Sequence, residues 1–426
     1  MYFQIYAVTM EITTILWNQS MVNDSNFANG SDSSTETIID NALAPSFTDY
    51  VEFKVAKFIN DYYLYLVCVI GIPGNLACIM TLTSMKPLLS SAIYMLALAV
   101  ADVIALALKI SYIRLTAEDV RLGDIGCRLI FMMGTMWQMY ANWVLVALTI
   151  ERFLAIWFPL KVRELSTKRN TLLVLSLMLL FFALANLQFL FTYEEVHDQF
   201  MVWDCRPKPK FAEFINKIWY WIDAILYALL PTILLLVFNS LIIFAVRRSG
   251  KKQRRMTFGH GKPTESLNQQ RQITTMLLTS SIIFVILVLP NSIFFIVKNY
   301  WTWRETSLGI SQYYLLLQII FLLSDLSHAL NFYLYCLSGR KFRQHFLKLI
   351  CPCRNGAETK WICLCCNETG ASMRPGAHRS RITYDITTSS ATNISTISIS
   401  PNVTPIKHAV KRCGWLDTLS HCAPSW

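Results

Sequence analysis

The sequence predicts an all-α membrane protein: a seven-transmembrane helix bundle followed by a short amphipathic eighth helix. Of its 426 residues, 54% are hydrophobic and only 15% are charged, whereas about a quarter of the residues in a soluble protein are charged. The apolar residues fall in seven runs, and a helix needs roughly 20 residues to cross a hydrocarbon core. Lipid offers backbone groups no partners, so each run is expected to be helical. The runs are residues 62–85, 87–113, 129–150, 170–193, 218–246, 272–297 and 306–338.

Few ionisable side chains interrupt these runs. They are Asp102, Lys109, Asp223, Asp325 and His328. An ionisable residue at membrane depth is costly and is therefore interpreted as functional by default. The alternative to a functional role for Asp102 is a neutral carboxyl group that only forms hydrogen bonds. The alternative for Asp223 is that it faces a water-filled cavity or pairs with Lys217.

The distribution of Lys and Arg predicts the orientation of the chain. The loops after the third, fifth and seventh runs are rich in basic residues, which favours the cytoplasmic side. Residues 1–61 carry eight acidic residues and only two lysines, so we expect an extracellular amino tail. The seven-transmembrane domain is then 62–338, the eighth helix 339–353 and the cytoplasmic tail 354–426, in a multi-pass protein of the plasma membrane. The basic loops lack a nucleic-acid-binding fold, so we expect lipid and no nucleic acid as their partner.

Both tails carry modification signals. Three Asn-x-Ser triplets, at Asn18, Asn23 and Asn29, predict glycosylation in the amino tail. The carboxyl tail is rich in Ser and Thr from about residue 380, and we expect disorder there. A passive tail and a multisite phosphorylation segment are both compatible with this composition.

The cysteines divide between two compartments. Cys127 and Cys205 lie on the outer side, where an oxidising environment favours a disulfide bridge between them. Cys351 and Cys353 follow the short basic helix and are candidates for palmitoylation. A zinc site is the alternative, although no histidine completes it nearby. Acylation would hold the helix flat on the inner leaflet, with Phe342 and Phe346 one turn apart and inserted into the lipid.

A series of motifs, each in its own run, resembles the rhodopsin-like (class A) G-protein-coupled receptors over roughly residues 62–353. They are Gly74-Asn75, the stretch 98–102 (LAVAD), Cys127 placed 25 residues before Arg152, Glu151-Arg152-Phe153, Pro231, Pro290 and Asn331 to Tyr335 (NFYLY). The overall pattern is similar to invertebrate neuropeptide receptors of the FMRFamide-like kind.

The resemblance implies a switch between two helix packings. An agonist shifts the population toward an open form, in which the inner half of the sixth helix swings outward and admits a heterotrimeric G protein. Arg152 would pair with Glu151 at rest and face the cytoplasmic cavity when active. The other switch residues carried over from the family are Asn331, Tyr335, Pro290 and Phe284. Arrestin and a receptor kinase would act at the Ser/Thr-rich tail.

The resemblance also implies a buried polar centre made by Asn75, Asp102 and Asn331, which in this family often holds a sodium ion as an allosteric modulator. Ala141 stands where a serine commonly completes that site. Apart from this possible ion, no cofactor and no metal are expected.

Four departures from the family pattern concern the switch. Phe332 follows Asn331 where the family has proline, so a weaker kink is expected in the seventh helix. Val288 replaces a tryptophan of the sixth helix, and Asn239 replaces a tyrosine that helps to hold the active state. The fourth run lacks its customary tryptophan.

Two membrane charges predict an ion pair. Lys109 lies seven residues outward from Asp102, and Asp325 lies six residues outward from Asn331; at a rise of 1.5 Å per residue both are about 10 Å from the polar centre. We expect a buried salt bridge between the second and seventh helices in the resting state. On an ideal helix, however, Asp325 points about 120° away from Asn331.

Residues that two other ligand classes require are missing from this sequence. Gly134 occupies the position of the aspartate that amine receptors use, and no lysine between residues 308 and 338 could hold retinal. The long outer loop, with mixed charges and large aromatic residues, favours a peptide, although interfacial aromatic belts look the same. The candidate pocket residues are Lys109, Gln138, Asp223 and Asp325.

Three other classes of protein were weighed. The nearest alternative is a chemosensory receptor for a small exogenous molecule on the same fold. A transporter or channel would show paired broken helices in two related halves, and no such repeat is found. No motif of an enzyme lies in the runs.

Overall fold

The computed structural model describes residues 46–86, 89–197, 203–256, 265–297 and 306–350. The glycosylation candidates Asn18, Asn23 and Asn29, the palmitoylation candidates Cys351 and Cys353, and the tail 354–426 lie outside these ranges and stay predictions.

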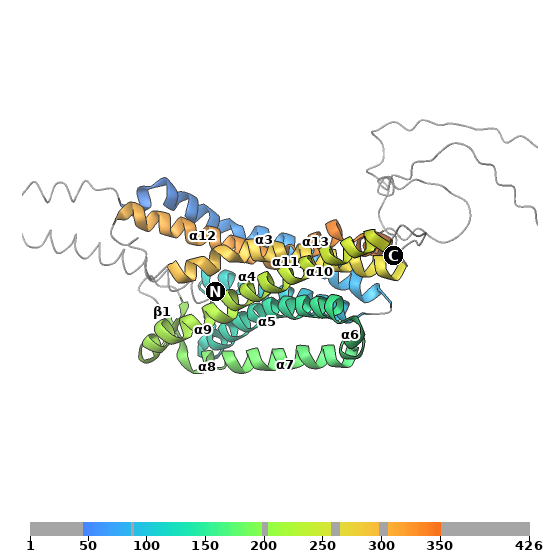
Figure 1. Ribbon diagram of the computed structural model, residues 1–426. Coiled ribbons are helices and arrows are strands. Elements are labelled where there is room, and N and C mark those ends of the chain that lie inside the picture. Colours follow the sequence, from blue (N-terminus) through green and yellow to red (C-terminus); the bar gives the residue numbers. More distant parts are fainter. Residues whose placement is uncertain (1–45, 87–88, 198–202, 257–264, 298–305, 351–426) are drawn as a thin grey trace, which may run out of the picture. The chain divides into compact units, whose positions relative to one another are not determined.

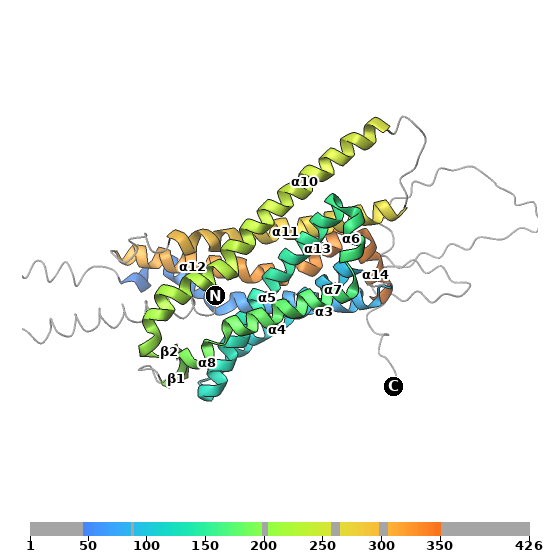
Figure 2. The same cartoon turned by 60° about the horizontal axis from the view of Figure 1, so that its bottom comes forward.

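Seven helical segments of the described chain are long and apolar enough to cross a membrane. They lie side by side as one bundle (Figure 1, Figure 2). Six of them correspond to α3 (Val51–Ser84), α4 (Ser90–Ala117), α5 (Gly123–Trp157), α7 (Lys168–Asn186) with α8 (Phe189–Thr192), α11 (Glu265–Val297), and α12 (Ser307–Ala329) with α13 (Asn331–Ser338). The other consists of the π-helix η3 (Phe214–Trp219), α9 (Tyr220–Ala224), the π-helix η4 (Ile225–Leu229) and α10 (Leu230–Met256).

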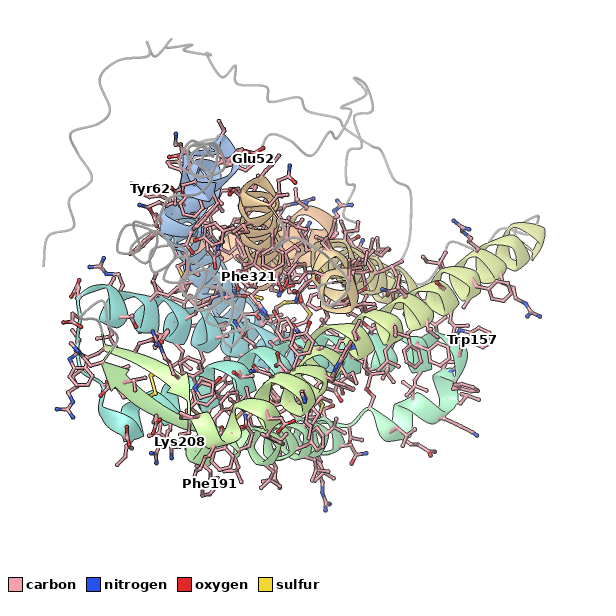
Figure 3. The ribbon with its side chains drawn as sticks, turned by 90° about the vertical axis from the view of Figure 1, so that its left-hand side faces the viewer. Glu52, Tyr62, Trp157, Phe191, Lys208 and Phe321 are labelled. Atoms are coloured by element: carbon pink, nitrogen blue, oxygen red, sulfur yellow. A yellow bond between two sulfur atoms is a disulfide. The ribbon has the colours of Figure 1, made fainter. Side chains whose placement is uncertain are left out.

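Short elements mark the two ends of the bundle. At one end the strands β1 (Tyr193–His197) and β2 (Trp203–Pro207) pair in antiparallel register, followed by η2 (Pro209–Phe211). At the other end lie α6 (Pro159–Leu165) and α14 (Arg340–Ile350). We name these the hairpin end and the α14 end. Figure 3 views the bundle from the hairpin end: Phe321 lies inside the ring of helices, whereas Phe191 points outward.

Helix α5 runs through the middle of the bundle and is the most buried of the seven spans, at 61% of its membrane window. Close helix approach elsewhere depends on a small residue. A Cβ atom at Gly71 of α3 would lie 2.7 Å from Leu106 Cδ1 of α4 and 2.9 Å from Ala329 Cβ of α12. Glycine at this position therefore lets three helices meet beside the polar centre.

The first helix begins earlier than expected. The amino tail was predicted to extend to residue 61, but α3 begins at Val51 and is preceded by η1 (Phe47–Asp49). Phe47 is fully buried against Phe53, and its carbonyl accepts a hydrogen bond from Ser311 Oγ at 2.6 Å. Charged residues in these first turns ended the apolar run in the sequence, although a helix can continue beyond the hydrocarbon core into water.

The eighth helix, α14, lies within the predicted range 339–353, but its aromatic residues face the bundle instead of lipid. Phe342 is 3% exposed and packs on Phe332 and Tyr335, with ring centroids 6.0 and 5.8 Å away. Phe346 lies 4.8 Å from Phe332. The prediction that both rings insert into lipid is therefore wrong: they attach α14 to the bundle. Leu349 and Ile350 are the exposed apolar residues at its end.

The seventh helix is interrupted at Leu330, where α12 ends and α13 begins, although Phe332 stands in the place of the family's proline. The interruption lies next to Asn331, whose side chain is held on two sides by other helices, at Asp102 and at Ser280. The sequence predicted only a weak kink here, because proline is absent. The interruption is nevertheless present, and polar contacts of Asn331 lie beside it.

Candidate functional site

The pair Glu151–Arg152 lies in α5, toward the α14 end of the bundle. Arg152 Nε lies 2.5 Å from Glu151 Oε2, and Arg152 Nη2 lies 2.8 Å from Oε1. The arginine is only 8% exposed. The predicted pairing of these two charges is confirmed in this arrangement.

Two serines that sequence reasoning missed complete this cluster. Arg152 Nη2 also donates to Ser91 Oγ of α4, and Ser166 Oγ donates to Glu151 Oε1 at 2.8 Å. Ser90 Oγ in turn donates to the Ser166 carbonyl at 2.5 Å. The position of Ser166 follows from Pro159, which begins α6 as its first residue and directs the chain back toward α4. Serine at a helix start is too common to have signalled this role.

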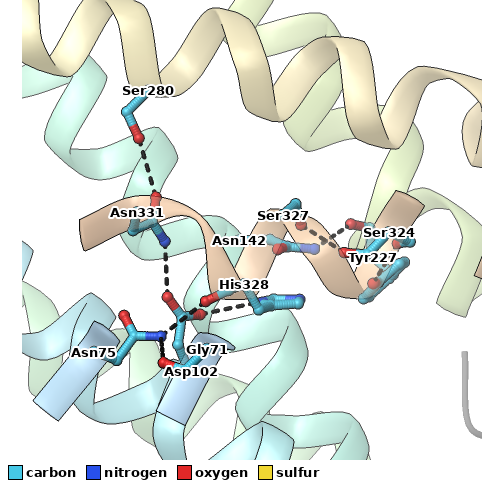
Figure 4. A network of polar contacts seen from close by, with 10 residues as sticks. All are labelled: Gly71, Asn75, Asp102, Asn142, Tyr227, Ser280, Ser324, Ser327, His328 and Asn331. Atoms are coloured by element: carbon cyan, nitrogen blue, oxygen red, sulfur yellow. Dashed lines mark hydrogen bonds and ion pairs between the residues drawn. The ribbon is translucent and has the colours of Figure 1, made fainter. Parts of the chain in front are cut away.

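The buried polar centre is assembled around Asp102 (Figure 4). Asn331 Nδ2 donates to Asp102 Oδ2 at 2.8 Å, and His328 Nδ1 lies 2.8 Å from Asp102 Oδ1. Asn75 Nδ2 donates to the carbonyls of His328 and Gly71 at 2.9 and 3.0 Å. The three predicted residues therefore meet, but Asn75 reaches the centre through the backbone of His328.

His328 is the member of this centre that sequence reasoning did not assign. It precedes Asn331 by three residues, so both side chains lie on one face of the seventh helix. That spacing was the available signal, since Asp102 had already been placed opposite Asn331.

As these side chains are arranged, they do not fit a sodium ion. Hard cations take oxygen ligands, but each oxygen of Asp102 faces a nitrogen, from His328 or Asn331. Asn75 must present its nitrogen to the centre, because the two carbonyls that it contacts can only accept hydrogen bonds. Its amide oxygen is turned away (Figure 4), and Ala141 supplies no oxygen at all.

The remaining switch residues belong to α11 and α13. Pro290 lies inside α11. Phe284 belongs to the main hydrophobic cluster, as does Tyr335, which is 1% exposed. Asn331 connects this group to the polar centre, because its Oδ1 accepts a hydrogen bond from Ser280 of α11 at 3.0 Å.

The predicted ion pair between the second and seventh helices is confirmed. Lys109 Nζ of α4 lies 2.5 Å from Asp325 Oδ2 of α12, and the two side chains are 1% and 0% exposed. The ring of Tyr63 on α3 lies 6.0 Å from the ammonium group. The two side chains meet although Asp325 was expected to point about 120° away from Asn331 on an ideal helix.

The other two pocket candidates are also buried. Gln138 of α5 and Asp223 of α9 are 2% and 3% exposed, and Gln138 Oε1 has no hydrogen-bond partner within the described residues. Lys217, the alternative partner considered for Asp223, instead pairs with Glu213 at 2.8 Å. Their burial is compatible with a pocket, and their role in binding stays a prediction.

The hairpin is attached to the start of α5. A disulfide joins Cys127 of α5 to Cys205 of β2, as predicted. Beside it, the Glu195 carboxylate accepts hydrogen bonds from the backbone N–H groups of Leu122 and Gly123 at 2.6 and 3.0 Å. A carboxylate is favourable there, because the first N–H groups of a helix lack partners inside it. Burial and the nearby Asp223 carboxylate hold the pKa of Tyr193, in β1, well above its ordinary value.

Comparison with known proteins points to one family. The family described as "7 transmembrane receptor (rhodopsin family)" matches residues 74–335, more than half of the chain. A probable G-protein coupled receptor of Caenorhabditis elegans is 24% identical over 310 residues, covering 68% of this chain and 69% of that protein.

Two further relatives carry names that refer to a secretagogue or to a peptide. The growth hormone secretagogue receptor type 1 of Oryctolagus cuniculus is 28% identical over 295 residues, covering 66% of this chain and 78% of that receptor. The sex peptide receptor-related protein 2 of Caenorhabditis elegans is 27% identical over 237 residues, covering 50% of this chain and 52% of that protein. These relatives are receptors, in agreement with the prediction of a receptor rather than an enzyme. With seven membrane-crossing helices and a family match across most of them, the chain is a multi-pass membrane protein and belongs to the rhodopsin family of seven-transmembrane, G-protein-coupled receptors.

Proposed function

We propose that this receptor binds an extracellular neuropeptide at its hairpin end and activates a heterotrimeric G protein at its α14 end. The amino terminus is then extracellular and the membrane is the plasma membrane, in line with the basic loops. The observation that carries the proposal is the closed Glu151–Arg152 pair, buried beside Ser91 and Ser166. A buried, fully paired arginine can act as a two-state latch, since opening the bundle exposes its charge to water or to a partner.

A peptide is favoured as the ligand class by two independent supports. Relatives are named as receptors related to growth hormone secretagogue and sex peptide. On the hairpin side of the polar centre, the bundle also holds buried charged side chains, namely Asp223 and the paired Lys109 and Asp325, and the buried Trp219. Such sites suit a ligand that presents both charged and apolar groups.

Activation requires the α14-end half of α11 to swing outward. A peptide that binds the open form better shifts the population toward it. Arg152 then leaves Glu151 and faces the cavity that the G protein enters. Arrestin and a receptor kinase would act afterward at the Ser/Thr-rich tail.

The test is a screen in cells that express the receptor with a promiscuous G protein. Amidated peptides are expected to raise cytosolic calcium, and Arg152→Ala is expected to abolish the response while binding of the active peptide persists. A response to small odorants but to no peptide would favour the chemosensory alternative. Unchanged signalling by Arg152→Ala would refute the latch.

A further inference from the structure

Helix α11 carries two adjacent buried serines that each bond to a different neighbouring helix. Ser280 Oγ donates to Asn331 Oδ1 of α13 at 3.0 Å, and Ser281 Oγ donates to Asn239 Oδ1 of α10 at 2.8 Å. Both serines are 1% exposed. The two hydrogen bonds therefore tie α11 on two sides at one level of the bundle; the first of them is visible in Figure 4.

Adjacency in the chain is what makes this arrangement possible. Neighbouring residues of a helix point about 100° apart, so a Ser-Ser pair can face two flanking helices at once. Residues spaced by three or four would face the same helix. Ser280 and Ser281 are thus placed to hold α11 between α10 and α13.

The tie lies on the part of α11 that activation must move. Ser281 precedes Pro290 by nine residues, about 14 Å at 1.5 Å per residue, and lies on the α14 side of Phe284. A proline is the usual point at which a helix bends. A swing about Pro290 that moves this part of α11 away from α10 and α13 therefore separates Ser281 from Asn239 and Ser280 from Asn331.

The arrangement also explains why asparagine stands at position 239. The short amide of Asn239 reaches Ser281 on α11 while both are buried. Asn331 connects the other serine to the polar centre, because its Nδ2 donates to Asp102 while its Oδ1 accepts from Ser280. Movement of α11 is thereby coupled to the network around Asp102.

We infer that Ser280 and Ser281 form a clamp that holds α11 in the resting arrangement, with Asn239 and Asn331 as its positioning residues. The inference rests on the proposed function, since the clamp acts on the helix whose outward swing that function requires. Release of the clamp leaves two amide oxygens without donors, and a water-filled open cavity can supply them.

Ser281→Ala is the central variant. An average interhelical hydrogen bond shifts an equilibrium about threefold, so ligand-free signalling per receptor at the cell surface is expected to rise about threefold. Ser280→Ala is expected to do the same, and the double variant is expected to signal more strongly than either single variant, because the two hydrogen bonds have different acceptors. Asn239→Leu is expected to match Ser281→Ala, and combining the two is expected to add nothing, because both remove the same bond.

Two controls separate the clamp from a general loss of packing. Ser281→Thr keeps the hydroxyl group and is expected to signal like the wild type. Ser292→Ala removes a hydrogen bond between the same two helices, Ser292 Oγ to Thr232 Oγ1 at 3.3 Å, but on the hairpin side of Pro290. It is expected to leave ligand-free signalling unchanged.

A second readout does not depend on the G protein. Spin labels on Thr275 of α11 and Leu160 of α6 report the distance between these helices in the purified, ligand-free receptor. Ser281→Ala and Ser280→Ala are expected to increase the long-distance population about threefold. If this population rises while signalling does not, the clamp stands and the proposed coupling fails. If neither variant moves the distance, or if Ser292→Ala moves it equally, the clamp is refuted.

Discussion

At the scale of single residues, the bundle interior holds charged side chains whose desolvation cost is offset only when they are paired. Lys109 and Asp325 are both buried and 2.5 Å apart. Burying two charges costs desolvation energy that their attraction roughly offsets, whereas one unpaired buried charge is strongly destabilising. Such a pair contributes little net stability when intact and a large penalty when one member is removed.

Single removal of either charge is therefore expected to destabilise the receptor, and joint removal to restore it. Lys109→Met or Asp325→Asn should each cost about 3 kcal/mol, measured as a lower thermal midpoint of the purified receptor. The double variant should recover most of this loss. The control is Arg114→Gln, which breaks an exposed ion pair with Glu118 and should leave the midpoint nearly unchanged. Equal and additive losses would contradict the coupling.

The occupied oxygens of Asp102 make a second prediction at this scale. Exchange of sodium for potassium at constant ionic strength is expected to leave the thermal midpoint of the purified receptor unchanged, because His328 and Asn331 already contact both carboxylate oxygens. His328→Ser frees one of them and adds an oxygen, so this variant is expected to gain a midpoint that rises with sodium. A sodium-dependent midpoint in the wild type would refute the assignment.

At the scale of elements, α14 is held by aromatic packing rather than by its basic residues. Phe342 inserts between Phe332 and Tyr335 and is 3% exposed. Tyr335 also belongs to the switch, so α14 stands in direct contact with it.

Phe342→Ala is therefore expected to loosen both α14 and the end of α13. Truncating a buried phenylalanine costs about 3 kcal/mol or more, and the thermal midpoint of the purified receptor should fall accordingly. Leu349→Ala, on the exposed end of the same helix, should change it little. Equal effects of the two variants would show that contact with lipid, and not with the bundle, holds the helix.

At the scale of the whole molecule, one covalent bond joins the hairpin to the bundle. The disulfide Cys127–Cys205 closes a segment of 78 residues, and Glu195 reinforces the same junction by accepting from the start of α5. The hairpin end is thereby joined covalently to the bundle, whereas at the α14 end the described contacts between helices are hydrogen bonds and packing.

Loss of the disulfide is expected to destabilise the receptor substantially. For a loop of this length the chain-entropy estimate is about 4 kcal/mol, so Cys127→Ser/Cys205→Ser should show a lower thermal midpoint and a reduced level at the cell surface. Cys336→Ser, which removes a free cysteine, serves as the control. An unchanged midpoint after mild reduction of the wild type would argue against a stabilising bridge.

The spans, the family motifs and the compartments of Cys127 and Cys205 could be predicted from the sequence. These features depend on local composition and on spacing along one helix, which the chain displays directly. Backbone groups in lipid must be paired within the helix, so an apolar run of sufficient length specifies its own secondary structure. The spans are therefore predictable without any tertiary contact.

Most contacts between polar side chains of different helices could not be predicted from the sequence; Lys109 with Asp325 is an exception. His328 beside Asp102, Ser91 and Ser166 beside the Glu151–Arg152 pair, and the two serine bonds of α11 join residues far apart in the chain, as with the separation of 226 between His328 and Asp102. The same holds for the inward-facing rings of α14. Each depends on how far a helix is rotated about its axis and where it is broken, as at Leu330. That rotation is set by packing against the neighbouring helices, which no single segment of the sequence contains.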